Sequence, residues 1–86
     1  MFEKRTYIAT FYTHFGAVRF HRERKAAGEE ARMMPVPRSL SSSCGTCVRF
    51  VTDDPPKEDP YDEIEQIVEE VQGTFTCIYR STEAGG

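Results

Sequence analysis

The sequence has no long hydrophobic run and no strong excess of one charge. No apolar stretch in its 86 residues approaches the length that spans a membrane, and the N-terminus lacks the pattern of a signal peptide. The formal net charge of −3 gives no general attraction to nucleic acid. We therefore expect a cytoplasmic protein that binds neither membranes nor nucleic acid.

Cysteine is scarce, and its number is odd. The chain has three cysteines, so at least one thiol stays unpaired within a monomer. Two of them form a C-x-x-C motif at Cys44 and Cys47. Because cytoplasmic thiols are normally kept reduced, this motif suggests metal binding or redox chemistry more than a permanent disulfide.

The remaining composition is typical of a small folded domain. Hydrophobic residues make up 38% of the chain, and they include six Phe and four Tyr. We expect one domain over residues 1–80 and a flexible tail over 81–86. The charge is unevenly distributed, since 19–25 is basic and 53–70 is mostly acidic. This asymmetry fits either solvated helix faces of opposite sign or a docking face for a partner or a second copy of the chain.

Local patterns predict six elements. The two helices have recognisable ends: Thr13 or His14 starts the first and Gly28 stops it, while Asp59 caps the second and Gly73 stops it. Apolar residues recur at helical spacing in the second helix, at Ile64, Ile67, Val68 and Val71. The full prediction is strands over 5–12, 30–36, 46–52 and 74–80, with helices over 13–27 and 60–72.

The order strand, helix, strand, strand, helix, strand favours a ferredoxin-like βαββαβ sandwich. In this α+β fold, two helices cover one face of a four-stranded antiparallel sheet. The turn after the first strand and the loop over 37–45 then share one end of the domain. We therefore expect Thr13 and His14 to lie near Cys44.

The loop around Cys44 contains residues that suit an anionic sulfur. A thiolate is the form of cysteine that acts as nucleophile and as metal ligand. Gly45 permits positive φ and close approach of a ligand to the backbone. The helix start at His14 contributes a partial positive charge. The expected donors and cations around the thiol are Arg38, Ser41, Ser42, Ser43 and Arg49.

Other interpretations of these residues stay open. A structural zinc needs about four ligands, and the chain offers Cys44 and Cys47, with His14 and His21 as candidates for the missing ones. A thiolate pair also suits Cu(I). Cys47 lies in or beside a strand and fits a buried, space-filling thiol equally well. Cys77 alternates with Phe75 and Tyr79, the pattern of a buried structural residue, and His14 can be a simple helix-start residue.

Several blocks of the chain, from about Tyr7 to Tyr79, resemble the selenium/sulfur-carrier-like proteins, a small bacterial family whose function is not established. The resemblance rests on four features in order: Thr13-His14-Phe15-Gly16-Ala17 after an opening strand, Ala27-Gly28 at a helix end, Pro37-Arg38, and Ser41 to Gly45 followed by Arg49-Phe50. It implies a functional centre at Cys44 and Gly45 with Pro37 and Arg38. Members occur alone or beside a TusA-type sulfur-carrier domain, which is the source of the selenium/sulfur label.

The leading hypothesis is a small carrier in which Cys44 accepts sulfur or selenium as a persulfide-type adduct. Arg38, Arg49 and the Ser41–Gly45 backbone would stabilise the anion, and Cys47 would resolve it. The partner would be a donor protein such as a desulfurase or a TusA-like carrier, and no cofactor is implied. Alternatives are a zinc or copper module and a plain interaction domain. Catalysis in the strict sense has the least support, because no acid–base pair or phosphate loop is visible.

Overall fold

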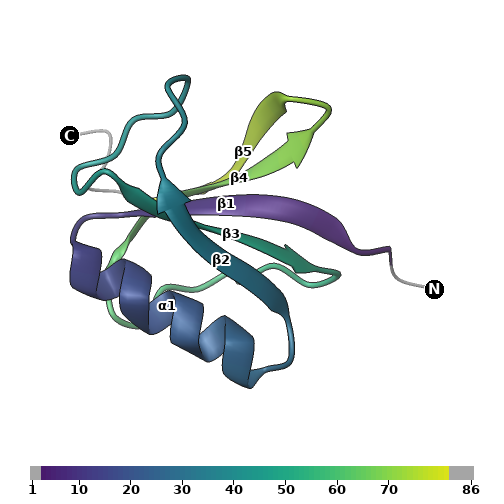
Figure 1. Cartoon of the computed structure of the whole chain (residues 1–86), viewed down its shortest axis with the longest axis horizontal. Coiled ribbons are helices and arrows are strands. Elements are labelled where there is room, and N and C mark those ends of the chain that lie inside the picture. Colours follow the sequence, from purple (N-terminus) through teal and green to yellow (C-terminus); the bar gives the residue numbers. More distant parts are fainter. Residues whose placement is uncertain (1–2, 82–86) are drawn as a thin grey trace.

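The computed structural model describes residues 3–81, and in this range the chain forms one helix and five strands (Figure 1). In chain order they are β1 (Arg5–Phe11), α1 (His14–Ala26), β2 (Glu30–Pro35), β3 (Thr46–Thr52), β4 (Ile64–Val71) and β5 (Thr74–Arg80). No helix in the described part of the chain is long and apolar enough to cross a membrane.

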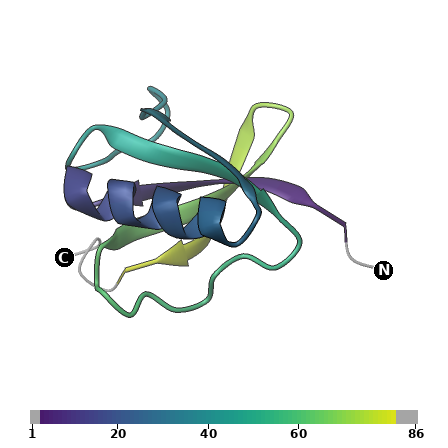
Figure 2. The same cartoon turned by 60° about the horizontal axis from the view of Figure 1, so that its bottom comes forward.

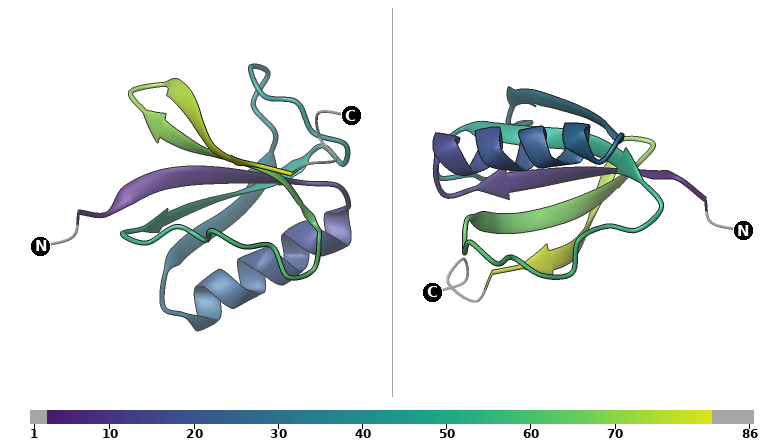
Figure 3. Two further views of the ribbon diagram at one scale, coloured as in Figure 1. Left: turned by 180° about the vertical axis from the view of Figure 1, so that it is seen from behind. Right: turned by 90° about the horizontal axis from the view of Figure 1, so that it is seen from below.

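The strands form one antiparallel sheet in the order β2-β3-β1-β4-β5. β1 is central, and β3 lies between β1 and β2, which is the split βαβ arrangement expected for the first half of the chain. Figures 2 and 3 show α1 lying across one face of the sheet. Part of the segment 36–45, between β2 and β3, packs on the opposite face.

The first helix forms as its sequence predicts. The Thr13 side chain caps it by accepting a hydrogen bond from the Gly16 backbone N–H at 3.1 Å. Gly28 follows its end with φ of +82°, the left-handed conformation that glycine adopts most easily. Ala17 and Phe20 are buried against the sheet, so a few packed side chains rather than a broad apolar stripe hold α1 in place.

Most of the core lies between α1 and the sheet. The ring of Phe20 packs edge-on against Phe50, with centroids 5.1 Å apart, and contacts Phe11 at 5.3 Å. Full burial of one such side chain stabilises a fold by about 2–3 kcal/mol. The buried residues on this side are Tyr7, Ala9, Phe11, Ala17, Phe20, Val48, Phe50, Ile64 and Ile67. A smaller cluster of Ile8, Cys47 and Val68 lies apart from it, partly covered by Met34, Val36, Leu40 and Phe75.

The predicted second helix is wrong. Residues 64–71 form β4, which pairs with β1 and turns directly into β5. The turn residues Gln72 and Gly73 have φ of 50° and 80°, the positive values typical of a two-residue hairpin turn. The ferredoxin-like sandwich with four strands and two helices is therefore also wrong in its details. In place of a second helix, the connector 53–63 leads from β3 to β4.

A β-bulge explains why β4 has a helical pattern in the sequence. Ile64 pairs with Phe11 and Gln66 pairs with Thr10, so Glu65 is an extra residue on β4. The shift lets Ile64 and Ile67 enter the same core although they are three positions apart. Asp59 caps the turn before β4 rather than a helix. Its carboxylate accepts hydrogen bonds from the Glu63 and Ile64 backbone N–H groups.

A second register shift corrects the prediction for β5. It falls between Ile67 and Val68, which pair with Tyr79 and Cys77. Tyr79 packs against the helix-side core, whereas Phe75 packs against the smaller cluster. The alternating residues of β5 therefore do not share one face, and Cys77 is exposed rather than buried. Apart from Ser81, the predicted tail lies outside the described residues.

Candidate functional site

The segment 36–45 is a closed loop between β2 and β3. The Val36 backbone N–H donates to the Gly45 carbonyl at 3.1 Å and closes its base. A tighter turn lies inside it, where the Leu40 N–H donates to the Pro37 carbonyl at 3.0 Å. Both bonds come from the loop's own backbone, and the first of them joins the two ends of the loop next to Cys44.

The end of this loop meets the start of α1, as the sequence predicts. The His14 Nδ1 atom lies 3.3 Å from the Thr46 hydroxyl oxygen. The Ser42 hydroxyl donates to the Phe11 carbonyl at 3.3 Å, at the end of β1. In Figure 1 the last part of the loop runs beside the first turn of α1. Cys44 thus lies at the end of the domain where β1 ends and α1 begins.

Cys44 is half-buried and packs against the helix-side core. Its thiol donates to the Thr46 carbonyl at 3.3 Å and lies 4.0 Å from the Ser42 hydroxyl oxygen. The neighbouring Gly45 has φ of +75°, and a Cβ placed there would meet no described atom within 4 Å outside Gly45 and its two chain neighbours. The sulfur is therefore held by the loop on one side, while the backbone next to it is open to an approaching group.

Cys47 has a different environment. It is fully buried and packs with Ile8 and Val68, apart from the cluster that Cys44 contacts. Its thiol donates to the Pro35 carbonyl at 3.7 Å. Burial raises the pKa of Cys47 to about 11, and the nearby Cys44 adds to this shift. Since the thiolate is the reactive form, Cys47 is poorly suited to react in the folded protein.

The Glu65 side chain joins the loop to the sheet by hydrogen bonds. Its carboxylate accepts hydrogen bonds from the Ser43 backbone N–H at 3.0 Å and from the Ser43 hydroxyl at 2.6 Å. The neighbouring Gln66 donates its side-chain N–H to the Ser41 carbonyl at 3.3 Å. The sequence prediction missed both contacts because it placed these residues on a helix. A strand over 64–71 beside β1 would have put them at the correct end of the sheet.

The two predicted arginines do not contact Cys44. Arg49 forms an ion pair with Glu70, with 3.1 Å between Nε and Oε1. Arg38 is exposed in the turn 37–40 and forms no hydrogen bond or ion pair with any residue in the range 3–81. Of the predicted neighbours, hydroxyl groups and the start of α1 therefore surround the thiol more closely than the guanidinium groups.

The suggested metal ligands are not assembled. Within residues 3–81, no three His, Cys, Asp or Glu side chains are grouped so that they could hold a metal ion. Cys44 and Cys47 pack against separate clusters, and His14 contacts Thr46 rather than either thiol. The alternative of a site made by Cys44, Cys47 and His14 has no geometric support in this arrangement.

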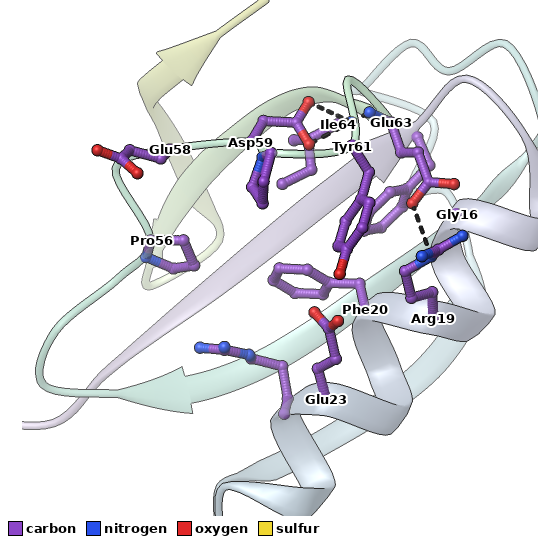
Figure 4. Close-up of a pocket in the computed structure, with 13 residues that line it drawn as sticks. Gly16, Arg19, Phe20, Glu23, Pro56, Glu58, Asp59, Tyr61, Glu63 and Ile64 are labelled. Carbon is purple, nitrogen blue, oxygen red and sulfur yellow. Dashed lines mark hydrogen bonds and ion pairs between the residues drawn. The ribbon is translucent and has the colours of Figure 1, made fainter.

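A separate pocket of about 160 Å³ lies between α1 and the connector 53–63 (Figure 4). In Figure 4 the Tyr61 side chain extends from the connector toward α1, between Phe20 and Arg19. Glu23 also lines this pocket, and none of the residues predicted for the cysteine site does. The pocket is therefore distinct from the region around Cys44.

The comparisons with known proteins agree with the resemblance seen in the sequence. No curated protein and no solved structure matches the chain significantly. A family model described as "Putative Se/S carrier protein-like" matches residues 6–80, which is most of the chain and includes the whole Cys44 loop. The chain therefore belongs to this Se/S carrier protein-like family.

Proposed function

We propose that this protein is a small carrier that holds sulfur or selenium on Cys44 as a persulfide-type adduct. The observation that supports it most is the contrast among the three cysteines. Cys44 is half-buried in a defined loop beside the open backbone of Gly45, whereas Cys47 is fully buried and Cys77 lies exposed on the edge strand β5. The name of the family supports the same cargo.

The transfer step needs no oxidant or reductant beyond the persulfide donor. The Cys44 thiolate attacks the outer sulfur of a donor persulfide, R–S–SH, and forms a new S–S bond. The S–S bond of the donor breaks, and its electron pair leaves with the inner sulfur as the thiolate R–S⁻. Cys44 then carries –S–SH, and attack by an acceptor thiol reverses the sequence. Selenium transfer follows the same balance with selenium as the outer atom.

The loop supplies groups for both states of Cys44. The Thr46 carbonyl accepts the hydrogen of the resting thiol. The Ser42 hydroxyl lies 4.0 Å from the sulfur and can turn its hydrogen from the Phe11 carbonyl to an anionic adduct. Exposed Arg38 is free to add a positive charge to the loop. Ser43 and Arg49 already bind Glu65 and Glu70, so we assign them to holding the structure rather than the adduct.

Transfer from Cys44 proceeds to an external thiol rather than to Cys47. The Cys47 sulfur is buried in the smaller cluster, and its raised pKa keeps it protonated near neutral pH. For Cys47 to attack an adduct on Cys44, the start of β3 would have to leave the sheet. We therefore propose a one-thiol carrier, with Cys47 as a packing residue.

Mass spectrometry after incubation with a cysteine desulfurase and cysteine tests this function. We expect the protein to gain one sulfur atom per chain, located on the peptide that contains Cys44. Cys44→Ser should lose the adduct, whereas Cys47→Ala and Cys77→Ser should retain it. The Cys77 variant is the essential control, because that thiol is also exposed and can react without any carrier role.

Loading that fails on Cys44, or that occurs equally on Cys77, contradicts the proposal. Replacing cysteine with selenocysteine in the same assay identifies the preferred cargo, since the two added atoms differ in mass. Faster loading and longer retention with one substrate would assign the carrier to that element.

A further inference from the structure

The outward face of α1 combines exposed apolar side chains with unpaired positive charge. Gly16, Ala17 and Phe20 face the core, so the side chains spaced three and four positions apart on the other side face away from it. These are Phe15, Val18, Arg19, Arg22 and Lys25. Phe15 is 66% exposed, the largest exposure among the big hydrophobic side chains in the described range. The one acidic residue of α1, Glu23, instead lines the pocket beside the connector.

This face contains a groove rather than a smooth surface. The groove has a volume of about 270 Å³ and is lined by Phe15, Val18, Arg19 and Arg22. Two of its lining residues are apolar and two are arginines. Exposed aromatic and arginine side chains are the residue types most enriched at the centres of protein interfaces.

The contacts of Arg19 show which chemical groups can bind to this surface. Its guanidinium lies 4.1 Å from the centroid of the Tyr61 ring and 5.3 Å from that of Phe15. Its Nε atom also lies 3.2 Å from a Glu63 carboxylate oxygen. An aromatic ring with an adjacent carboxylate thus occupies one side of Arg19. Further along the same face, Arg22 and Lys25 are exposed and have no such partner among residues 3–81.

The face begins beside the proposed carrier site. Phe15 follows His14, and the His14 ring reaches the hydroxyl of Thr46, two residues after Cys44. A protein bound over Phe15 would therefore cover the end of the domain that contains the Cys44 loop. A donor must approach this end in any case, because its persulfide has to reach the Cys44 sulfur.

We propose that Phe15, Val18, Arg19, Arg22 and Lys25 form the docking surface for the protein that donates sulfur or selenium to Cys44. This inference rests on the proposed function. The partner presents an acidic surface with an apolar or aromatic side chain that enters the groove, which repeats the chemistry of Tyr61 and Glu63 on Arg19. A nucleic acid fits less well, because the chain has a net charge of −3 and acidic residues of the connector flank the helix.

Two double variants test the charge of this surface. Arg22→Glu/Lys25→Glu reverses two exposed charges on the outward face, and Arg22→Gln/Lys25→Gln removes them without adding acid near the end of the helix. The matched control is Lys4→Glu/Arg32→Glu, which reverses two exposed charges just before β1 and on the edge strand β2. Each variant is loaded once by a cysteine desulfurase with cysteine and once by inorganic polysulfide, which needs no docking.

We expect desulfurase loading of Arg22→Glu/Lys25→Glu to fall about tenfold or more, because charges at an interface act mainly on the association rate. The Gln variant should be intermediate, and the control should match the wild type. Polysulfide loading should be the same in all four proteins. The desulfurase-dependent rate of the wild type should also fall with added salt, as expected for attraction between opposite charges.

Binding of the desulfurase to Cys44→Ser, measured by calorimetry, separates this inference from the proposed function. If Cys44 never gains an atom but binding is lost on Arg22→Glu/Lys25→Glu, the docking surface stands and the carrier function fails. Equal loading or equal binding of the outward-face variant and the control overturns the docking surface. A dimer of the wild type that dissociates on the same charge reversal assigns the face to a second copy and also overturns the proposal.

Discussion

Glu65 binds Ser43 through two hydrogen bonds, at 3.0 Å to the backbone N–H and 2.6 Å to the hydroxyl. Glu65 can do so because it is the extra residue of a β-bulge, and bulges often redirect a side chain next to a functional site. The loop that carries Cys44 is therefore tethered to β4 by a carboxylate rather than left to its own backbone. The Cys44 loop is thus joined directly to the sheet through the Glu65 side chain.

Removal of this carboxylate should loosen the loop. In Glu65→Ala the Ser43 N–H loses its acceptor, and we expect its hydrogen exchange to be about tenfold faster, the equivalent of about 1.4 kcal/mol of local stability. Glu65→Gln keeps one acceptor oxygen and should show a smaller increase. The control is Glu69→Gln on the same strand, which pairs with exposed Arg5 and should leave Ser43 unchanged. An unchanged Ser43 amide in Glu65→Ala would show that the loop holds itself.

Thiol labelling should distinguish the three cysteines. With its pKa near 11, roughly one in a thousand Cys47 side chains is a thiolate at pH 8, and the sulfur is also buried. We expect an alkylating reagent to modify Cys77 and Cys44 in the folded protein and Cys47 only after denaturation. A mild oxidant should likewise form no Cys44–Cys47 disulfide. Rapid labelling of Cys47 would mean that β3 opens, and it would restore the resolving role that the C-x-x-C spacing suggests.

Cys47 should also make stability depend on alkaline pH. Its folded pKa of about 11 lies above the usual value of 9.0, so the folded state holds a proton that the unfolded state releases. The stabilisation is present below about pH 9 and is lost as pH rises through about 11. Burial also raises the pKa of Tyr7 and Tyr79, and these act in the same direction. The difference between wild type and Cys47→Ala in urea unfolding at several pH values isolates the thiol, and parallel curves would contradict this assignment.

The first half of the fold could be predicted because local and long-range signals agree there. The cap at Thr13 and the stop at Gly28 define α1, and β-branched and aromatic residues define β1 and β3. The meeting of His14 with the Cys44 loop followed from the crossover between β1 and β2. That deduction did not need the second helix, so it survived the error in the second half.

The second half could not be predicted because its apolar spacing is ambiguous. Ile64 and Ile67 have helical spacing, but a bulge at Glu65 produces the same spacing in a strand. A bulge depends on the pairing partner, here the end of β1, and a single sequence gives no sign of that pairing. Because of the same error, the hydrogen bonds of Glu65 and Gln66 to the Cys44 loop were not predicted. Apart from Thr13 and His14, the residues named around Cys44 were close to it in sequence, whereas the contacts of its loop with β4 join residues more than twenty positions apart.

The turn between β4 and β5 offers a simple gain in stability. Gln72 has φ of 50°, which is unfavourable for a side chain of its type, and Gly73 follows with 80°. Asn-Gly is the preferred pair for this kind of turn, so Gln72→Asn should stabilise the fold by about 0.5 kcal/mol. Gly73→Ala should destabilise it by about 1 kcal/mol. Urea unfolding checks both changes, and a neutral Gly73→Ala would argue against the hairpin.

Close packing between α1 and the connector gives the last prediction. A Cβ on Gly16 would lie 2.9 Å from the Glu63 Cβ, which is closer than two carbon atoms can pack. Alanine favours a helix over glycine by about 1 kcal/mol, but the clash should outweigh this gain and leave Gly16→Ala about 1 kcal/mol less stable than wild type.

A double-mutant cycle shows whether the clash is the cause. Glu63→Gly removes the opposing Cβ and the ion pair with Arg19, and its own cost is measured alone. On that background Gly16→Ala should become stabilising, because the helix preference then acts without the clash. Thermal or urea unfolding of the four proteins gives the coupling energy between positions 16 and 63. A Gly16→Ala effect of the same size on both backgrounds would place the connector farther from α1 than the structure does.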